Sequence, residues 1–417
     1  MKLAVVGSGI AGMGAAWLLR RKYDVTVYEK NDYIGGHSRT IQVNYDNKPI
    51  SVDTGFIVFN HKNYPNLTQL FKHLGVAVEK SDMSFGVSIN GGQLEYSGVN
   101  AGGLLAQKAN LFKPDFYKLL LDILKFNRNA AAILKRDENP TLGEYLTQMG
   151  MSDWFRKYYI LPMGGAIWST PLEEMLDYPA KTFIQFFEEH GLLTVSDQPQ
   201  WYTVKGGSKE YIKKLTMPYK DNIQLKCGVK DITRKETKIV VTDTNGDKAD
   251  YDHVVIAAHG DQALAMLKDA DAAEKQILSS FKYKKNTVVV HRDPSLMPKR
   301  KAAWASWIYL ANEGDSGDKL AVTYWMNKLQ NIDMKHPLFV TMNPPHAPAE
   351  ELTFDTFNFE HPVYDMKAID AQKNLAKIQG KRNTWFVGSY LKYGFHEDAF
   401  TSALEVAKEL GATPPWR

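Results

Sequence analysis

Four residues near the N-terminus have the types and spacing of a dinucleotide site. Gly7, Gly9 and Gly12 form a Gly-x-Gly-x-x-Gly pattern, and Glu29 follows at the end of an apolar run. The first glycine permits a tight turn, the second lets the backbone approach a pyrophosphate, and the third lets a helix pack close to a strand. A carboxylate such as that of Glu29 can accept hydrogen bonds from a ribose. The pattern therefore predicts a nucleotide cofactor held through its phosphates and its ribose.

The elements expected around this pattern would position it correctly. Residues 3–6 predict a strand, residues 10–19 predict a helix, and residues 25–28 predict a second strand that ends at Glu29. The N-terminus of the helix offers free N–H groups and the positive end of a dipole to phosphate. The cofactor prediction therefore rests on this order of elements as well as on the glycine spacing.

The uncharged stretch at residues 3–19 has a second interpretation, as an export signal or a short membrane span. A spanning helix needs about twenty apolar residues, and this stretch is shorter. Arg20 and Arg21 follow it directly, without a small-residue cleavage site. We therefore expect it to belong to the folded domain, in a cytoplasmic protein that can associate with the inner face of the membrane.

The composition bounds the class of protein. The 417 residues suffice for two domains with substantial cores, and 44% are hydrophobic while 24% are charged. A net charge of +4 is too small to indicate nucleic acid, so we expect no such partner. Cys227, the single cysteine, excludes an intramolecular disulfide, and no group of residues has the spacing of metal ligands, so we expect no metal.

A second motif follows the predicted ribose carboxylate. It consists of a glycine pair with a polar segment and, further on, an Asp-x-Gly segment: Gly35, Gly36, His37, Ser38 and Arg39, then Asp53, Thr54, Gly55 and Phe56. Here the chain resembles the superfamily of FAD-containing amine oxidases, protoporphyrinogen oxidases and phytoene desaturases. The family usually has Arg or Lys where this chain has His37. The phosphate contact made there would then come from Arg39, Ser38 or the backbone.

The resemblance continues in order to the C-terminus. It runs through residues 201–212, 227–232, 252–258 and 385–399. In the family, the second of these segments meets the adenine, and the last one closes over the ribityl chain and pyrimidine edge of the flavin. The order of the motifs covers nearly the whole chain.

The resemblance implies FAD as the cofactor. We expect noncovalent binding, because Cys227 lies in the segment expected on the adenine side rather than near the C-terminal motif. The implied cofactor-binding residues are Gly7, Ser8, Gly9, Ala11, Gly12, Glu29, Lys30, Gly36, His37, Ser38, Arg39, Thr54, Gly55, Phe56, Val229, Ala257, Gly388, His396, Asp398 and Ala399.

Several motifs are similar to one branch of the superfamily, at residues 35–38, 53–56, 161–170, 324–327 and 394–398. This branch includes bacterial flavin proteins and the flavin domain fused to plant cyclopropane fatty-acid synthases, and bacterial relatives are associated with fatty-acyl modification. The resemblance thus implies an FAD-dependent oxidoreductase that oxidises an apolar substrate, such as the fatty-acyl chain of a phospholipid, by hydride transfer to the flavin. One alternative is a flavin amine oxidase acting on a small amine. Another is a non-redox lipid-binding protein, which the intact glycine pattern disfavours.

The family fold would place an ionisable pair, His396 and Glu397, near the flavin ring. Either residue could take a proton or fix a polar group of the substrate. The alternative for Glu397 and Asp398 is capping of the last helix. His259 is a weaker candidate. Trp168, Tyr390 and Tyr393 are candidates for the substrate pocket, with core packing as their alternative role.

The separated FAD motifs predict an α/β fold with a discontinuous Rossmann-type FAD-binding domain and a second, substrate-binding domain of helices and a mixed sheet. The predicted FAD-binding domain comprises residues 1–84, 201–262 and 381–417, and the substrate-binding domain comprises 85–200 and 263–380. Strands of the second domain are predicted at 287–291, 305–310, 321–326 and 338–342.

A basic amphipathic helix is predicted from Pro114 to Arg136. Its polar residues recur three and four positions apart, and basic side chains outnumber acidic ones. Such a helix either contacts an anionic membrane or packs on its own domain with a charged face in solvent. We favour packing, and the lipid substrate implied by the resemblance keeps the membrane alternative open.

Overall fold

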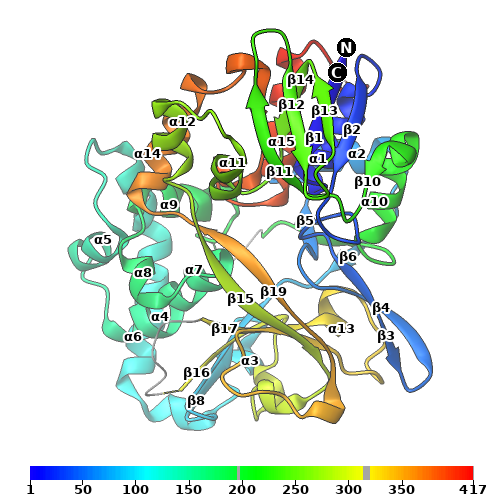
Figure 1. Ribbon diagram of the computed structural model, residues 1–417. Coiled ribbons are helices and arrows are strands. Elements are labelled where there is room, and N and C mark those ends of the chain that lie inside the picture. Colours follow the sequence, from blue (N-terminus) through cyan, green and yellow to red (C-terminus); the bar gives the residue numbers. More distant parts are fainter. Residues whose placement is uncertain (195–197, 313–319, 417) are drawn as a thin grey trace.

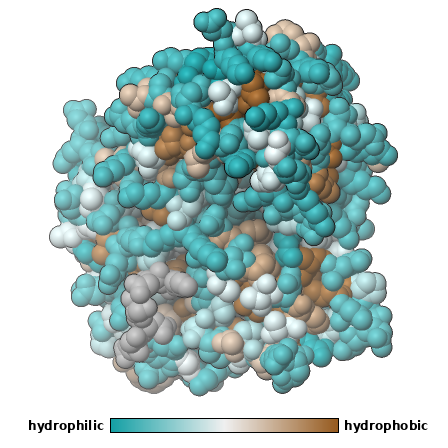
Figure 2. Space-filling model, in the orientation of Figure 1, coloured by the Kyte–Doolittle hydropathy of each residue, from teal (hydrophilic) through white to brown (hydrophobic). Residues whose placement is uncertain are grey.

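The computed structural model describes residues 1–194, 198–312 and 320–416. Figure 1 shows a nucleotide-binding part at the top, where both chain ends lie, a large sheet at the lower right, and the helices labelled α4 to α9 at the left. The part of the chain that is described contains no helix long and apolar enough to cross a membrane. The face in Figure 2 is mostly hydrophilic, with hydrophobic residues in separate patches.

A five-stranded parallel sheet carries the predicted nucleotide motif. Its order is β10-β2-β1-β14-β20, with β1 at Lys2–Val6, β2 at Asp24–Tyr28, β10 at Ile223–Gln224, β14 at His253–Ile256 and β20 at Thr384–Phe386. These strands come from three separated segments of the chain. Helix α1 (Ile10–Leu19) is buried along its whole length and packs beside α15 (His396–Glu409).

The second sheet is mixed and has seven strands in the order β19-β15-β18-β17-β16-β7-β8. Its strands are β7 (Phe85–Ile89), β8 (Leu94–Ser97), β15 (Lys282–His291), β16 (Trp307–Ala311), β17 (Ala321–Trp325), β18 (Phe339–Met342) and β19 (Thr353–Val363). Only β16 and β7 pair in parallel. The sequence predicted four of these strands and missed β7, β8 and β19.

Helices cover one side of this sheet and share its hydrophobic core. They are α3 (Ala101–Leu104), α4 (Pro114–Asn129), α5 (Leu142–Gln148), α6 (Asp153–Phe155), α7 (Leu161–Trp168), α8 (Leu172–Leu176) and α9 (Ala180–Glu189). The helix predicted at 114–136 is an α-helix only as far as Asn129. The following residues, Ala130–Lys135, have 3-10 geometry.

The remaining helices and strands lie outside the two large sheets. They are α2 (Pro65–His73), α10 (Lys209–Thr216), α11 (Gly260–Met266), α12 (Ala272–Leu278), α13 (Met326–Leu329), α14 (Met366–Asn374), β3 (Thr40–Tyr45), β4 (Lys48–Asp53), β5 (Val58–Asn60), β6 (Val78–Ser81), β9 (Trp201–Val204), β11 (Val229–Arg234), β12 (Ile239–Asp243) and β13 (Lys248–Tyr251). Helices α11, α12 and α14 join the hydrophobic cluster of the parallel sheet, on the face that carries Val6 and Val254. The nucleotide-binding part thus takes in residues that the sequence assigned to the second domain.

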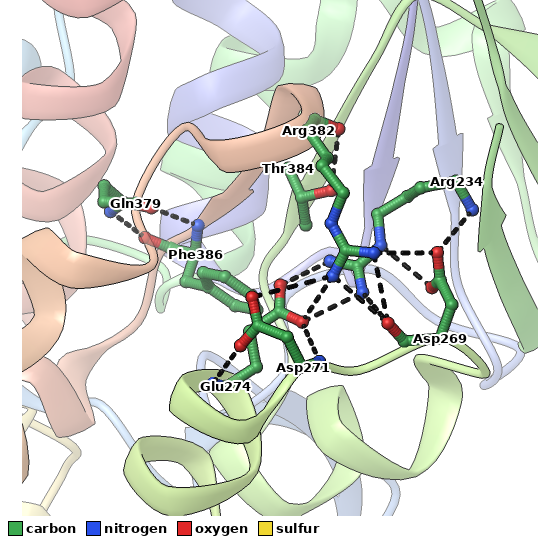
Figure 3. Close-up of polar contacts among 8 residues, drawn as sticks. All are labelled: Arg234, Asp269, Asp271, Glu274, Gln379, Arg382, Thr384 and Phe386. Atoms are coloured by element: carbon green, nitrogen blue, oxygen red, sulfur yellow. Dashed lines mark hydrogen bonds and ion pairs between the residues drawn. The ribbon is translucent and has the colours of Figure 1, made fainter. Parts of the chain in front are cut away.

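A buried ion network ties three of these segments together (Figure 3). Arg234 at the end of β11 and Glu274 in α12 pair, and each side chain is only 1% exposed. Arg234 also binds Asp269 at 2.9 Å, and Arg382, just before β20, binds Glu274 at 2.9 Å. The two guanidinium groups therefore share one buried carboxylate that joins β11, α12 and the approach to β20.

We expect Glu274→Gln to lower the free energy of unfolding by about 3 kcal/mol, because it removes the buried carboxylate that two guanidinium groups share and leaves them only the more exposed Asp269. Urea denaturation followed by circular dichroism measures this loss. The matched control is Asp370→Asn, which breaks the exposed Asp370–Lys373 pair and should cost less than about 1 kcal/mol. Equal effects of the two substitutions would contradict the role given to the network.

Candidate flavin site

The three glycines of the N-terminal motif have different surroundings. Gly7 has φ +102°, and a Cβ there would lie 2.6 Å from the carbonyl oxygen of Ala257. A Cβ on Gly12 would lie 1.9 Å from the carbonyl oxygen of Gly7, whereas a Cβ on Gly9 would meet nothing within 4 Å. Gly7 and Gly12 are thus required by the packing of the turn. Gly9 faces open space in front of α1, where a phosphate group can approach the backbone.

The glycine pair of the second motif lies directly beside this turn. The Gly35 N–H donates to the carbonyl oxygen of Ser8 at 3.0 Å. Gly36 has φ +58°, and a Cβ there would lie 3.2 Å from the Cα of Gly9. Two motifs that are separate in the sequence therefore form one glycine-lined wall.

Glu29 is buried at the end of β2, next to the same turn. Its carboxylate accepts hydrogen bonds from the Ser8 N–H at 3.0 Å, the Ser8 hydroxyl at 2.6 Å and the Asn31 N–H at 2.8 Å. These contacts fix the carboxylate against the glycine turn. Because a carboxylate has about four acceptor positions, it retains capacity for a ribose hydroxyl.

The start of α15 meets the second motif through His396. Its Nε2 lies 3.0 Å from the Ser38 hydroxyl and 2.8 Å from the Tyr211 hydroxyl, and its ring stacks on Phe56 with centroids 3.8 Å apart. Burial lowers the pKa of His396 to about 3, and His37 adds to the effect, so the ring is neutral at pH 7. Tyr211, which the sequence did not predict as a site residue, closes this hydrogen-bonded group through a 2.6 Å contact with Ser38.

Two helix N-termini face the same region. The N-terminus of α1 begins at Gly9, and that of α15 begins at Phe395. Each presents free N–H groups and the positive end of a helix dipole, which favours a bound anion. The two helix dipoles add positive potential beside the glycine turn.

A group of histidines adds neutral polar atoms beside the motif. The ring of His37 stacks on Phe359 with centroids 4.4 Å apart and lies 5.3 Å from His361. The Nε2 of His37 and the Nδ1 of His259 are buried without a hydrogen-bond partner. Burial lowers the pKa of His37 to about 4 and the pKa of His259 and His361 to about 3. Unpartnered buried nitrogens are the atoms that a polar cofactor would satisfy.

Three predicted residues contact groups of the protein itself, and for Asp398 this is the capping role that the sequence offered as an alternative. Glu397 accepts hydrogen bonds from the N–H groups of Asn66 and Leu67, both at 2.9 Å, and so caps α2. Asp398 accepts the N–H of Phe395 at 2.9 Å and caps α15, and burial raises its pKa to about 7. Arg39 pairs with Asp355 of β19 at 2.9 Å. These partners hold the three side chains within the protein itself.

The other predicted cofactor residues lie around the turn and its neighbours. Ala257 touches the position of Gly7, and a Cβ on Gly55 would lie 2.1 Å from the His37 carbonyl oxygen. Thr54 donates to the carbonyl oxygen of Arg39, and Gly388 donates to the Ser402 hydroxyl. Ala11 and Ala399 are buried in the first turns of α1 and α15, while Lys30 follows β2 and Val229 begins β11.

The candidate substrate residues fall into two places. Trp168 is buried and donates from its Nε1 to the carbonyl oxygen of Tyr393 at 3.1 Å. These two residues belong to an aromatic cluster next to the start of α15, comprising Trp168, Tyr178, Phe186, Tyr393 and Phe395. Tyr390 is buried in the separate hydrophobic cluster of the parallel sheet, where its ring lies 4.7 Å from that of Phe281. Trp168 and Tyr393 therefore share one environment, and Tyr390 lies apart from them.

The described residues contain no group of three or more His, Cys, Asp or Glu side chains that could hold a metal ion. The polar groups around the glycine wall instead suit an organic cofactor. Gly9, the glycine wall and the two helix N-termini would hold its pyrophosphate, and Glu29 its ribose.

This fold and site define a dinucleotide-binding flavoprotein. The chain belongs to the family of flavin-containing amine oxidoreductases, which it matches over residues 10–295. It is therefore an FAD-dependent oxidoreductase, and FAD supplies a two-electron acceptor for its substrate.

Solved structures with the same fold cover nearly the whole chain. One is a fatty acid isomerase from P. acnes that produces CLA, with a TM-score of 0.69, 14% identity and 99% coverage of both chains. Another is cyclohexylamine oxidase from Brevibacterium oxydans, with a TM-score of 0.70, 15% identity and coverage of 98% of this chain and 99% of the other. Identities this low indicate a shared fold only.

Curated relatives match shorter parts of the sequence. A 1-hydroxycarotenoid 3,4-desaturase of Flavobacterium is 51% identical over 43 residues, which are 10% of this chain and 9% of the relative. An uncharacterized protein of Methanocaldococcus jannaschii is 26% identical over 200 residues, 45% of this chain and 44% of the relative. The chain thus matches less than half the length of either relative.

We expect Gly9→Val to lose FAD and keep its fold, because Gly9 has an ordinary extended backbone and its side of the turn is open. An overpacking cost of about 1–3 kcal/mol would weaken FAD binding by roughly 10- to 100-fold. Flavin absorbance and circular dichroism measure the two properties. Gly12→Val is the matched variant, and it should unfold the domain because its side chain enters the turn. Full flavin occupancy in folded Gly9→Val would refute the assignment.

The flavin should be bound noncovalently. Cys227 is buried and its thiol lies 3.1 Å from Asp243, and burial raises its pKa to about 11, so it is a poor nucleophile. Acid precipitation of the purified protein should release all of the FAD into the supernatant. Yellow colour that stays with the precipitate would show a covalent link.

Proposed function

We propose that the protein oxidises a fatty-acyl chain, with the substrate carbon that gives up hydride held against the flavin. The proposal rests on the hydrogen bonds that the buried carboxylates accept from the protein. The buried acids of the described residues are Glu29, Asp53, Glu95, Asp122, Asp243, Glu274 and Asp293. Each accepts hydrogen bonds from groups of the protein itself.

The carboxylates near α15 are also engaged. Glu397 accepts hydrogen bonds from two N–H groups of α2, and Asp398 accepts one from the N–H of Phe395. A small-amine oxidase that anchors its substrate through an acid would need a carboxylate that faces the ammonium group, whereas Glu397 and Asp398 face backbone N–H groups at helix ends. The aromatic cluster around Trp168 instead offers apolar rings, which suit a hydrocarbon chain.

The similar proteins include both classes of substrate. The solved fatty acid isomerase and the matching carotenoid desaturase are both named for extended apolar substrates. The solved cyclohexylamine oxidase has the same fold and represents the competing class. The choice between them for this chain therefore rests on its own side chains.

We assign positioning rather than proton transfer to the predicted pair. His396 is neutral and its Nε2 is shared between Ser38 and Tyr211, so it fixes the second motif against the start of α15. Glu397 links α15 to α2. Both residues shape the site, and the aromatic cluster excludes water from a bound chain.

Anaerobic reduction of the bound flavin tests the substrate class. We expect phospholipid vesicles to bleach the visible flavin absorbance, because the aromatic cluster offers apolar contacts to an acyl chain, and we expect small primary amines to leave it unchanged. Oxidised lipid recovered by mass spectrometry should lack two hydrogens, one transferred to the flavin as hydride and the other released to the buffer as a proton. Bleaching by a primary amine with no response to lipid would favour the amine oxidase alternative. A stable yellow protein that binds lipid without bleaching would favour the non-redox alternative.

The variant Glu397→Gln separates the two roles of that residue within the same assay. Because its carboxylate caps α2, we expect a lower melting temperature and an unchanged rate of flavin reduction. Thr401→Val is the control, since it removes the 3.5 Å contact with Glu397 and the 3.1 Å hydrogen bond from the Asn66 side chain but leaves both backbone contacts of the Glu397 carboxylate in place. A slower reduction at unchanged melting temperature would instead make Glu397 the proton acceptor.

A further inference from the structure

The outward face of α4 and the turn before it carry an unusual number of exposed hydrophobic side chains. Six of the twelve exposed large hydrophobic residues in the described chain lie within residues 105–124. They are Leu105, Leu111, Phe112, Tyr117, Leu121 and Leu124. Phe112 is 88% exposed and Leu121 is 66% exposed. Single exposed leucines need no explanation, but a group of this kind marks an interaction surface.

These residues are not the packing face of the helix. Phe116, Leu119 and Phe126 form that face and are at most 1% exposed. Asp122 lies on the same side and accepts the N–H of Ser152 at 3.0 Å. Tyr117, Leu121 and Leu124 recur at helical spacing on the other side. The fold therefore anchors α4 through one face and leaves a second apolar face outside.

The surface is also strongly basic. Residues 99–136 contain seven basic and two acidic side chains, a net charge of +5, while the whole chain has +4. The basic residues are Lys108, Lys113, Lys118, Lys125, Arg128, Lys135 and Arg136. Among the described ion pairs, none involves these seven side chains. Lys113, Lys125 and Arg136 donate hydrogen bonds to uncharged groups of the protein. Residues 105–128 alone carry five basic and two acidic side chains, a net charge of +3.

We propose that residues 105–128 dock on the surface of an anionic phospholipid bilayer. Exposed leucine, phenylalanine and tyrosine would enter the boundary between headgroups and acyl chains, and the lysine and arginine groups would contact anionic headgroups. Long basic side chains can follow an apolar surface while their charges stay at the headgroup level. The same helix face therefore carries apolar groups for the acyl-chain boundary and basic groups for the headgroups.

The charge argues against a second copy as the occupant. A twofold interface would bring the same basic surface of each chain face to face, and like charges placed opposite each other disfavour binding. Binding to an acidic protein is the alternative outcome of the test.

This inference stands on the surface alone, although it deepens the proposed function by naming the source of a lipid substrate. Vesicle binding needs no flavin chemistry, so either proposal can fail while the other holds. For that reason binding is measured with FAD-loaded protein and without a redox readout.

Co-flotation with vesicles tests the proposal. Equimolar phosphatidylcholine and phosphatidylglycerol vesicles should bind the protein, and pure phosphatidylcholine vesicles should bind it much less. Lys108→Gln/Lys118→Gln/Arg128→Gln should weaken binding by about 100-fold, since each basic residue near the surface contributes about 1 kcal/mol. The control Lys220→Gln/Lys275→Gln/Lys408→Gln removes the same charge from exposed positions elsewhere and should bind as the original does. Salt should weaken binding, because charges are screened beyond about 10 Å at 0.1 M salt.

A second pair of variants tests the apolar contribution. Phe112→Ser/Leu121→Ser should reduce binding, whereas Met217→Ser/Met334→Ser, at residues 52% and 50% exposed, should not. Absence of binding to anionic vesicles, or equal loss in the surface and control variants, would overturn the proposal. Binding to an acidic polypeptide but not to the vesicles would also overturn it and would identify a protein partner instead.

Discussion

The close approach of α1 to the turn after β1 is the constraint on which the site depends. A Cβ on Gly12 would lie 1.9 Å from the Gly7 carbonyl oxygen, so only glycine allows the helix to begin where it does. That position sets the N-terminus of α1 and brings Gly9 opposite Gly36. The adjacent Ser8 then holds Glu29 through two hydrogen bonds. The phosphate and ribose contacts expected of the cofactor therefore depend on the close approach of Gly12 to the Gly7 carbonyl oxygen.

The electrostatics of the site follow from backbone dipoles rather than from basic side chains. The family usually places Arg or Lys at the position of His37, whose pKa here is lowered to about 4 by burial. Arg39 is paired with Asp355. The two helix N-termini at Gly9 and Phe395 add positive potential. Neutral histidines can donate hydrogen bonds to a phosphate or a flavin edge without the desolvation cost of a buried charge.

The sequence predicted the parts of the site that depend on local chemistry. The glycine turn, β1, α1 and β2 are contiguous, so spacing and hydrophobic pattern were sufficient. The contacts of Glu397 and Arg39 were not predictable, because their partners Asn66 and Asp355 lie far away in the sequence. Strand β19 was missed for a related reason. It pairs with β15 at the edge of the sheet and is mostly polar, so its pattern resembles that of a loop.

The helix at 114–129 has two different faces. One agrees with the interpretation that the helix packs on its own domain, and the other is the face proposed to contact a membrane. Its inward residues Phe116 and Phe126 belong to the same hydrophobic core as Trp168 and Phe186, which agrees with packing on the domain. Its outward residues Leu121 and Leu124 are exposed among unpaired basic groups. Periodicity alone could not separate the cases, because leucine and phenylalanine occur on both faces. Anchoring the helix in the core that also contains the aromatic cluster gives the outward face a rigid base. The proposed contact of its leucines and lysines with a membrane would therefore need no rearrangement of the site.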